Sequence, residues 1–307
     1  MDGELEKRLA AFECRIKSRA HRNRSKFIGQ CLDIQAKPAR EAGEIGYMAN
    51  MLVQATLPHS KQSGSYFKRK NGSITIELMS SSKGLPYGSY PRLLMAWLTT
   101  QVCRNENEGP KIHLGESLSQ FMAKLGLCAT GGRWGSISNL KDQAARLFSS
   151  DIVVWDERKS AGQMQKLSVA EEYVWWEHAN NAQQGTFESW VTLSDRFFNA
   201  IKKDPVAVDM RAMRALKKSP LALDLYTWAT YRASYLQHRT VIPWHSLQQQ
   251  FGTGYPNTTR GTLDFKAKLL RTLQKVGDAY TDLRSCAAET ENGLMLLPMP
   301  PHVRKSK

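Results

Sequence analysis

The chain has 307 residues, 41% of them hydrophobic, and its 43 lysines and arginines outnumber 28 acidic residues to give a formal net charge of +15. This length fits two domains of ordinary size, and the charge favours a polyanionic partner, with nucleic acid ahead of a membrane surface. Five scattered cysteines without a CxxC pair argue against a disulfide framework or a cysteine zinc site. No run approaches the ~20 apolar residues that span a bilayer, and no signal-peptide pattern occurs, so we expect a cytoplasmic protein without a membrane partner.

The N-terminal region is expected to form a basic helical arm. Apolar residues recur at helical spacing over residues 4–19, and six basic residues without an acidic one lie between Arg15 and Lys26. The basic run is interpreted as a phosphate-contacting arm or a partner-binding helix, with a solvated basic face as the alternative. Residues 30–46, which include Pro38, are predicted to be a linker.

The next stretch is predicted to form a β-hairpin, a helix, a short strand and a second helix. Residues 66–78 alternate in polarity around Asn71-Gly72, which is a strong hairpin signal. A helix is then expected to start at Tyr90 or Pro91 and to run through Cys103. A short strand over residues 111–114 and a helix over residues 117–127 follow.

Residues 130–155 carry the pattern around which the first half is organised. The Gly131-Gly132 turn bears Arg133 and Trp134 and precedes a helix whose apolar residues share one face. A β-branched run predicts a strand over residues 151–155, and residues 156–162 form a polar turn, interpreted as the wing. Residues 166–176 and 186–193 are expected to be further strands. Helix, turn, helix and strand in this order are typical of a winged helix-turn-helix.

The second half repeats this order with looser similarity. The predicted elements are a helix over 194–200 capped by Ser194, an extended piece over 206–208, a helix over 220–236, a strand over 240–244, a short helix over 246–251, a helix from the turn at 253–257 to about Val276, and a hairpin over 280–297. We therefore predict an α+β protein with tandem winged-helix domains. Its predicted divisions are an arm and linker at 1–45, domains at 46–193 and 194–300, and a tail at 301–307.

The polar faces of the two long amphipathic helices predict DNA contacts. Phosphate contacts are expected from Arg133, Arg158, Lys159, Arg260 and Lys268. Base contacts are expected from Ser138, Asn139 and Arg146 in the first half and from Asn257, Arg260 and Arg271 in the second, since arginine suits guanine and asparagine suits adenine. Lys141, on the flank of the first helix, completes the predicted set. A solvated helix face is the alternative for each residue.

Motifs for catalysis are missing from the sequence, so we expect no enzyme and no cofactor. There is no Walker A motif, no Asp-x-Asp pair, no His-x-His pair and no GxSxG elbow. These absences argue against an ATPase, a two-metal polymerase or primase, a rolling-circle nickase and a serine hydrolase. His178 and His245 remain alternatives as catalytic groups, but surface or packing roles are more common for histidine.

Three stretches resemble the plasmid-encoded RepA replication initiator family. They are GYMANMLVQATLPHS at 46–60, GLPYGSYPRLLMAWL at 84–98 and TGGRWGSISNLKDQAARLF at 130–148. The helix at 194–199 and the following PVAVDM also match, so the similarity covers roughly residues 45–300. The N-terminal arm lies outside it.

The resemblance implies a plasmid replication initiator that binds repeated sites (iterons) in double-stranded origin DNA. Such proteins open the adjacent DNA and bring in host replication proteins such as the host initiator and helicase, and they often alternate between a repressing homodimer and an iteron-binding monomer. The family implies no catalytic residues. A winged-helix transcriptional repressor without initiator activity is the alternative.

Overall fold

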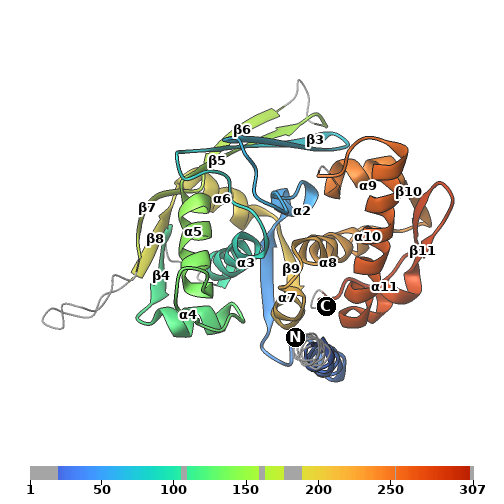
Figure 1. The fold of residues 1–307 in the computed structure, drawn as a ribbon, viewed down its shortest axis with the longest axis horizontal. Coiled ribbons are helices and arrows are strands. Elements are labelled where there is room, and N and C mark those ends of the chain that lie inside the picture. Colours follow the sequence, from blue (N-terminus) through green and yellow to red (C-terminus); the bar gives the residue numbers. More distant parts are fainter. Residues whose placement is uncertain (1–19, 105–108, 159–162, 176–188, 253, 305–307) are drawn as a thin grey trace, which may run out of the picture.

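The computed structural model describes residues 20–104, 109–158, 163–175, 189–252 and 254–304, which form a mixed α/β structure (Figure 1). Helices α3 (Ser89–Arg104) and α8 (Pro220–Ala233) lie at its centre. α4 to α6 lie on one side and α9 to α11 on the other, and the four-stranded sheet runs along the top of the view from the first side toward α9. The predicted helix over residues 4–19 lies outside the described residues.

Two antiparallel sheets build the first half. One has the strand order β2-β3-β5-β6 and the other β4-β8-β7, and the predicted hairpin around Asn71-Gly72 is confirmed as β2 and β3. The strands are β2 (Tyr66–Asn71), β3 (Ile74–Ser80), β4 (Lys111–Gly115), β5 (Ser150–Asp156), β6 (Gln163–Ser168), β7 (Ala170–Val174) and β8 (Ser189–Leu193). The helices are α2 (Asn50–Gln54), α4 (Leu118–Lys124) and α5 (Ser136–Phe148).

The prediction of one strand over residues 166–176 was wrong. β6 and β7 belong to different sheets and are separated at Val169, which is fully buried. The Val169 amide donates to the Ser150 carbonyl, and its own carbonyl accepts from the Ser194 amide. These bonds tie Val169 to two segments at once, so the chain turns there from one sheet into the other.

Helices dominate the second half, with one small sheet ordered β10-β12-β11. The elements are α6 (Asp195–Lys203), β9 (Pro205–Asp209), α7 (Met210–Leu216), α9 (Trp244–Phe251), α10 (Thr259–Ala279), α11 (Thr281–Cys286), β10 (Thr240–Pro243), β11 (Ala287–Glu289) and β12 (Gly293–Leu296). The side chain of Ser194 accepts from the Phe197 amide, which confirms it as the N-cap of α6.

Two further predictions are corrected by helices. Residues 280–297 were expected to be a hairpin, but Thr281–Cys286 form α11 and the strands begin only at Ala287. Leu283 is fully buried from this helical turn. The expected linker at 30–46 begins instead as a helix over residues 20–36, whose Cys31 and Ile34 are buried against the body of the protein.

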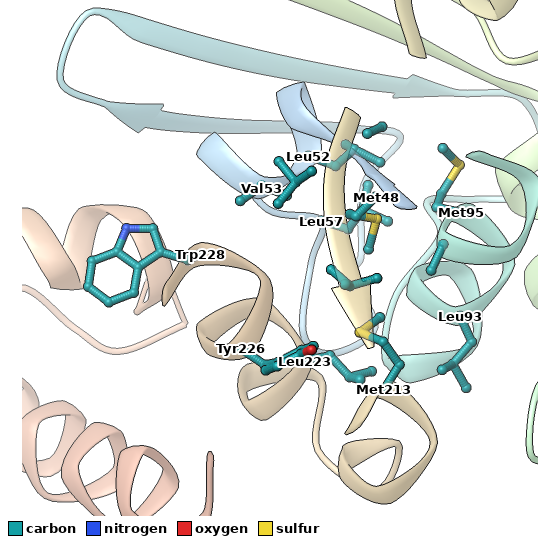
Figure 2. Packing of buried hydrophobic residues seen from close by; sticks show 14 of the residues in the cluster. Met48, Leu52, Val53, Leu57, Leu93, Met95, Met213, Leu223, Tyr226 and Trp228 are labelled. Carbon is teal, nitrogen blue, oxygen red and sulfur yellow. The ribbon is translucent and has the colours of Figure 1, made fainter. Parts of the chain in front are cut away.

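Pairing between distant strands joins the two halves. β1 (Ile45–Ala49) pairs antiparallel with β9, so residues from both predicted domains share one two-stranded sheet. Figure 2 shows Met48 beside this ribbon, between Leu93 and Met95 of α3 and Leu223 and Tyr226 of α8. All of these side chains belong to one continuous buried apolar cluster, which fixes the central helices relative to each other.

Candidate nucleic-acid interface

A rigid glycine turn sets the start of α5. Gly132 has a φ of +85°, a conformation that favours glycine. A Cβ on Gly135 would lie 2.2 Å from the Thr130 carbonyl oxygen, so the backbone there passes too close for a side chain. Thr130 and Ser136 close the turn through a 2.9 Å bond from the Ser136 amide to the threonine hydroxyl. The sequence pattern at this turn is thus explained by backbone geometry.

The amphipathic character predicted for α5 is confirmed. Leu140, Ala144, Leu147 and Phe148 are buried, while Ser138, Asn139 and Asp142 are exposed on the other side. The turn before α5 presents Arg133, whose guanidinium carbon lies 5.3 Å from the ring centroid of Trp134. Trp134 is 84% exposed, so a cation and a large aromatic ring stand together in solvent at the N-terminal end of the helix.

Arg146 does not project from the polar face of α5 as the sequence suggested. Its side chain is only 15% exposed, and its Nε donates to Asp142 over 2.8 Å. The guanidinium lies 5.6 Å from the ring centroid of Tyr87 and so close to Gly84 that a Cβ there would clash with it. Gln143 accepts a hydrogen bond from the Tyr87 amide, so the 84–87 segment is fastened to α5. Arg146 would therefore have to give up its contacts with Asp142 and Tyr87 before it could contact a base.

The polar turn after β5 is held by an ion pair. Arg158 donates from Nε and Nη2 to the two carboxylate oxygens of Asp156, over 2.8 and 2.9 Å. The side chain of Arg158 is nevertheless 54% exposed, so it can exchange this partner for a phosphate. Lys159, predicted beside it, lies outside the described residues.

Helix α10 presents an open polar face. The Thr258 side chain caps it by accepting from the Gly261 amide over 3.1 Å, and Phe265, Leu269, Leu273 and Val276 are buried as predicted. Arg260 is 85% exposed and pairs with Asp264 over 3.3 Å. The other predicted residues, Asn257, Lys268 and Arg271, are also exposed. This α10 face consists of Arg260, Asp264, Lys268 and Arg271.

The predicted contacts form two separate groups. Figure 1 shows α5 and α10 on opposite sides of the central helices α3 and α8. One group comprises the α5 face (Ser138, Asn139, Lys141 and Asp142) with Arg133 in the turn before it. Arg158 belongs to neither group, because it follows β5 at the end of that strand remote from α5. The other is the α10 face with Asn257. DNA that contacts both groups must therefore run across the body of the protein from α5 to α10.

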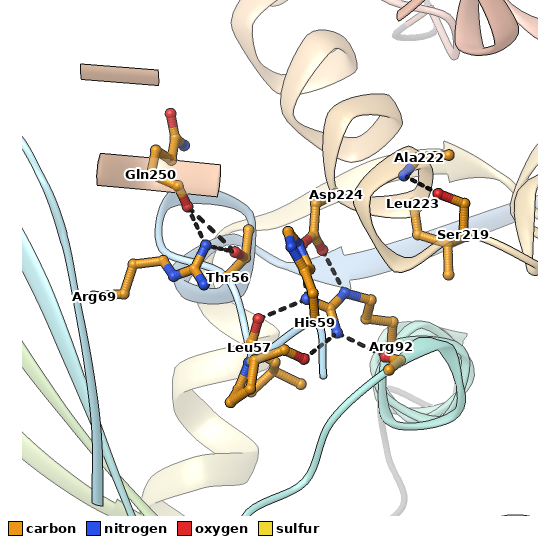
Figure 3. Close-up of polar contacts among 12 residues, drawn as sticks. Thr56, Leu57, His59, Arg69, Arg92, Ser219, Ala222, Leu223, Asp224 and Gln250 are labelled. Carbon is orange, nitrogen blue, oxygen red and sulfur yellow. Dashed lines mark hydrogen bonds and ion pairs between the residues drawn. The ribbon is translucent and has the colours of Figure 1, made fainter. Parts of the chain in front are cut away.

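A buried polar network joins the elements between these groups, and sequence reasoning did not find it. Arg92 of α3 donates from Nε and Nη2 to the two carboxylate oxygens of Asp224 of α8, over 2.6 and 2.7 Å. His59 bonds the same carboxylate over 2.7 Å (Figure 3). Arg92 also donates to the carbonyls of Leu57, Pro58 and Gly88. We name Arg92, Asp224 and His59 the junction network.

Asp224 of the junction network is ionised at neutral pH. Burial opposes the charge of Asp224, but the Arg92 guanidinium and the His59 hydrogen bond outweigh it and hold the pKa of Asp224 at about 2. Burial lowers the pKa of His59 below its ordinary value, although its bond to Asp224 opposes this shift. A paired carboxylate and guanidinium with a neutral imidazole therefore link α3 to α8.

A metal-type cluster and a membrane-spanning helix are both absent from the described residues. In that part of the chain, no three histidines, cysteines or acidic residues gather as a metal site would require. None of the helices described there is long and apolar enough to cross a membrane.

Known proteins provide likenesses in structure and in sequence. A crystal structure of domains 2 and 3 of RctB covers 81% of this chain and 98% of its own, with a TM-score of 0.52 at 14% sequence identity. A second structure of the same RctB domains covers 80% and 94%, with a TM-score of 0.48 at 17% identity. At these identities the likeness concerns the fold alone. No curated protein matches the sequence. A family model described as plasmid-encoded RepA protein matches residues 85–245, which include α5 and the junction residues Arg92 and Asp224 but end before α10.

Proposed function

The chain belongs to the family of plasmid-encoded RepA proteins, and from this premise we propose that it is a plasmid replication initiator. The observation that carries the proposal is the family match over residues 85–245, more than half of the chain. The net charge of +15 fits a protein whose partner is the DNA of the origin. The initiator binds repeated sites at that origin and promotes opening of the adjacent DNA.

We propose that each half of the chain holds a winged helix-turn-helix. In the first half, α4, the glycine turn and α5 are followed by the antiparallel pair β5 and β6. In the second, α9, a turn and α10 are followed by α11 and the antiparallel pair β11 and β12. Each long helix then enters a major groove, and two such units on one chain cover successive grooves of one site.

The geometry favours different tasks for the two helices. α10 offers Arg260 and Arg271 for guanine edges, and the turn before it offers Asn257 for adenine, because these side chains are exposed. α5 offers Ser138 and Asn139 for bases, with Arg133 and Lys141 for phosphates. Arg158 adds a phosphate contact from the turn after β5.

Strand opening is proposed to follow from DNA bending and from assembly of several copies on the repeats, without catalysis by this chain. Recruitment of the host initiator and helicase, and a repressing homodimer, are proposed from the family resemblance. A supercoiled plasmid with the origin, probed with a single-strand-specific nuclease, tests the opening step. Absence of any opened DNA with the purified protein alone would contradict it.

Specific recognition is the first property to measure. The purified chain is titrated with duplex DNA of its own plasmid's repeats and with a scrambled duplex, over a range of salt concentrations. A preference of about 10³ or more at physiological salt is expected for a sequence-specific reader. Equal affinity for both duplexes, with only a steep salt dependence, would leave a non-specific DNA binder.

A winged-helix transcriptional repressor is the alternative function. It shares the DNA-binding surface, so binding data do not separate the two. Replication does: the initiator supplied in trans sustains a plasmid that carries only its repeats, and a pure repressor does not.

A further inference from the structure

A second basic feature lies beside the junction network, away from the α5 face. A cavity of about 370 Å³ opens between β2, the segment at 58–62, the start of α8 and α10. Its lining includes Arg69, His59, Lys218 and Lys268, each contributed by a different one of these segments. Among the described lining residues none is aspartate or glutamate. We call this space the junction cavity.

Arg69, one of the residues that line the junction cavity, carries a buried guanidinium. Arg69 is 2% exposed, and its Nη1 donates to the Thr56 hydroxyl over 2.9 Å and to the Gln250 carbonyl (Figure 3). Burial lowers the pKa of Arg69 to about 10, so the group keeps its charge at neutral pH at a cost in solvation. An anion that enters the cavity offsets part of that cost.

Lysines gather at the opening of the cavity. Lys218 and Lys268 are both exposed and line it, and Lys218 also reaches Asn23 of the N-terminal helix over 2.8 Å. Lys275 lies about two helical turns beyond Lys268 on the same side of α10. Its pKa is lowered by burial and by the charges of Lys218 and Lys268. Lys218 and Lys268, which both line the cavity, form a field that attracts a multiply charged anion.

Hydroxyl and amide groups complete the chemistry of the lining. Ser60, Gln62 and Ser219 contribute neutral donors, and Ser219 stands at the N-terminus of α8, where the helix dipole favours negative charge. Cations combined with neutral donors are the groups that bind phosphate oxygens.

We propose that the junction cavity binds a phosphate group, carried either by the DNA backbone or by a free phosphate compound. This inference deepens the proposed function in the first case and is independent of it in the second. Lys268 belongs both to the α10 face and to the cavity opening, so a duplex that lies along α10 passes within reach of the cavity. A phosphate held there contacts β2 and α8 together, and so ties the DNA to both halves of the protein.

The test compares Lys218→Gln with Lys37→Gln in the full chain. Lys218 is decisive because it lines the cavity without belonging to the α10 face, and Lys37 is an exposed lysine that does not line it. Inorganic pyrophosphate is titrated by calorimetry at constant ionic strength. Saturable binding to the parent and to Lys37→Gln, weakened about tenfold in Lys218→Gln, is the expected result.

A DNA arm identifies the source of the phosphate. If it is the backbone, Lys218→Gln lowers the slope of log K against log salt by about 0.9 for repeat and scrambled duplexes alike, and pyrophosphate competes with DNA. An unchanged slope together with tenfold weaker pyrophosphate binding assigns the cavity to a free phosphate compound. Absence of saturable pyrophosphate binding with an unchanged slope overturns the proposal. The preference for repeats over scrambled DNA stays intact in each outcome, so failure here is distinct from failure of the proposed function.

Discussion

Helices α5 and α10 each carry an aspartate and an arginine four residues apart, but the two pairs behave differently. In α5 the aspartate comes first, the Asp142–Arg146 distance is 2.8 Å, and the arginine side chain is 15% exposed. In α10 the arginine comes first, the Arg260–Asp264 distance is 3.3 Å, and the arginine is 85% exposed. The acid-first order is the more favourable one in a helix, because it also agrees with the helix dipole.

The difference shows that equal charge on two helix faces does not mean equal availability. Arg146 is held by Asp142 and by the ring of Tyr87, and its release costs these contacts before any base is bound. Arg260 is held only by an exposed pair, which contributes little and can be exchanged for a base or a phosphate. We therefore expect guanidinium recognition to come mainly from α10, and α5 to act through its turn and its short polar side chains.

α5 and α10 can act on one DNA site only if they are fixed to one body of the protein. Removal of Arg92 tests that condition and has the largest expected effect. Arg92→Leu leaves the Asp224 carboxylate buried with His59 alone, and we expect it to lower the free energy of unfolding by about 3–5 kcal/mol. Urea denaturation measures it. The control is the double variant with Asp224→Leu, which removes the unpaired charge and should recover part of the loss. A single variant within about 1 kcal/mol of the parent would mean that the network holds nothing together.

Alanine at each arginine tests the comparison itself. Arg260→Ala should weaken binding to repeat DNA by about 1–3 kcal/mol and relax preference at one base pair, because it removes an exposed guanidinium. The sequence alone suggests the same for Arg146→Ala, but its internal contacts shift the expectation toward a loss of folding stability with a smaller change in specificity. Binding to a set of single-base variants of the repeat measures preference, and urea denaturation measures stability. A larger relaxation for Arg146→Ala would reverse the roles of the two helices.

Local sequence patterns predicted the helices and strands well where the pattern of apolar residues extends over many residues. The apolar faces of α5 and α10, the hairpin of β2 and β3 and the cap at Ser194 all follow from neighbouring residues. The failures lie where tertiary contacts decide. Residues 281–286 are helical because Leu283 is buried in the core from this turn, and the chain changes sheets at Val169 because two distant segments bond its backbone.

The candidate interface was predictable only as a set of residue types. Nothing near Arg146 in the sequence indicates that Gly84 and Tyr87 cover it, because the segment that does so is about 60 residues away. The junction network joins Arg92 to a carboxylate 132 residues further along the chain, so no spacing rule connects them. Exposure and pairing depend on such long-range contacts, whereas the position of a residue on a helix face does not.

Mild acid should lower the free energy of unfolding through buried histidines at and beside the junction network. Two buried histidines contribute: His59 of the junction network, and His302, whose Nδ1 bonds the Tyr226 hydroxyl of α8 over 2.8 Å. Burial lowers the folded-state pKa values of both below the unfolded value of 6.5, so the unfolded chain binds more protons at acidic pH. The stability from their neutral forms is complete above pH 6.5 and is lost as the pH falls below it. We expect the free energy of unfolding to decrease between pH 7 and 5. Each tenfold weakening of a histidine's proton affinity in the folded state corresponds to a decrease of up to about 1.4 kcal/mol.

Substitution of each histidine by glutamine shows how much it contributes to the pH dependence of stability. His59→Gln keeps an N–H donor for Asp224 and should remove part of the slope of stability against pH, and His302→Gln should remove another part. Urea denaturation at several pH values provides the measurement. If neither variant changes the slope, the loss in acid comes from other groups and the junction is not pH-sensitive.

The smallest effect is expected at the turn after β5, where the same question of availability arises for Arg158. Its guanidinium donates two hydrogen bonds to the Asp156 carboxylate and its backbone amide donates a third, which is a stronger hold than Asp264 has on Arg260, although the Arg158 side chain is 54% exposed. If DNA displaces Asp156, Arg158→Gln lowers the salt slope of binding by about 0.9, with an affinity loss below about 1 kcal/mol for all sequences alike. Asp156→Asn is the matched variant, because it releases Arg158 without removing its charge and should strengthen binding slightly. An unchanged salt slope in both variants would mean that Arg158 stays with Asp156 in the complex, and that pairing withholds a cation from DNA in the first half even where the side chain is exposed.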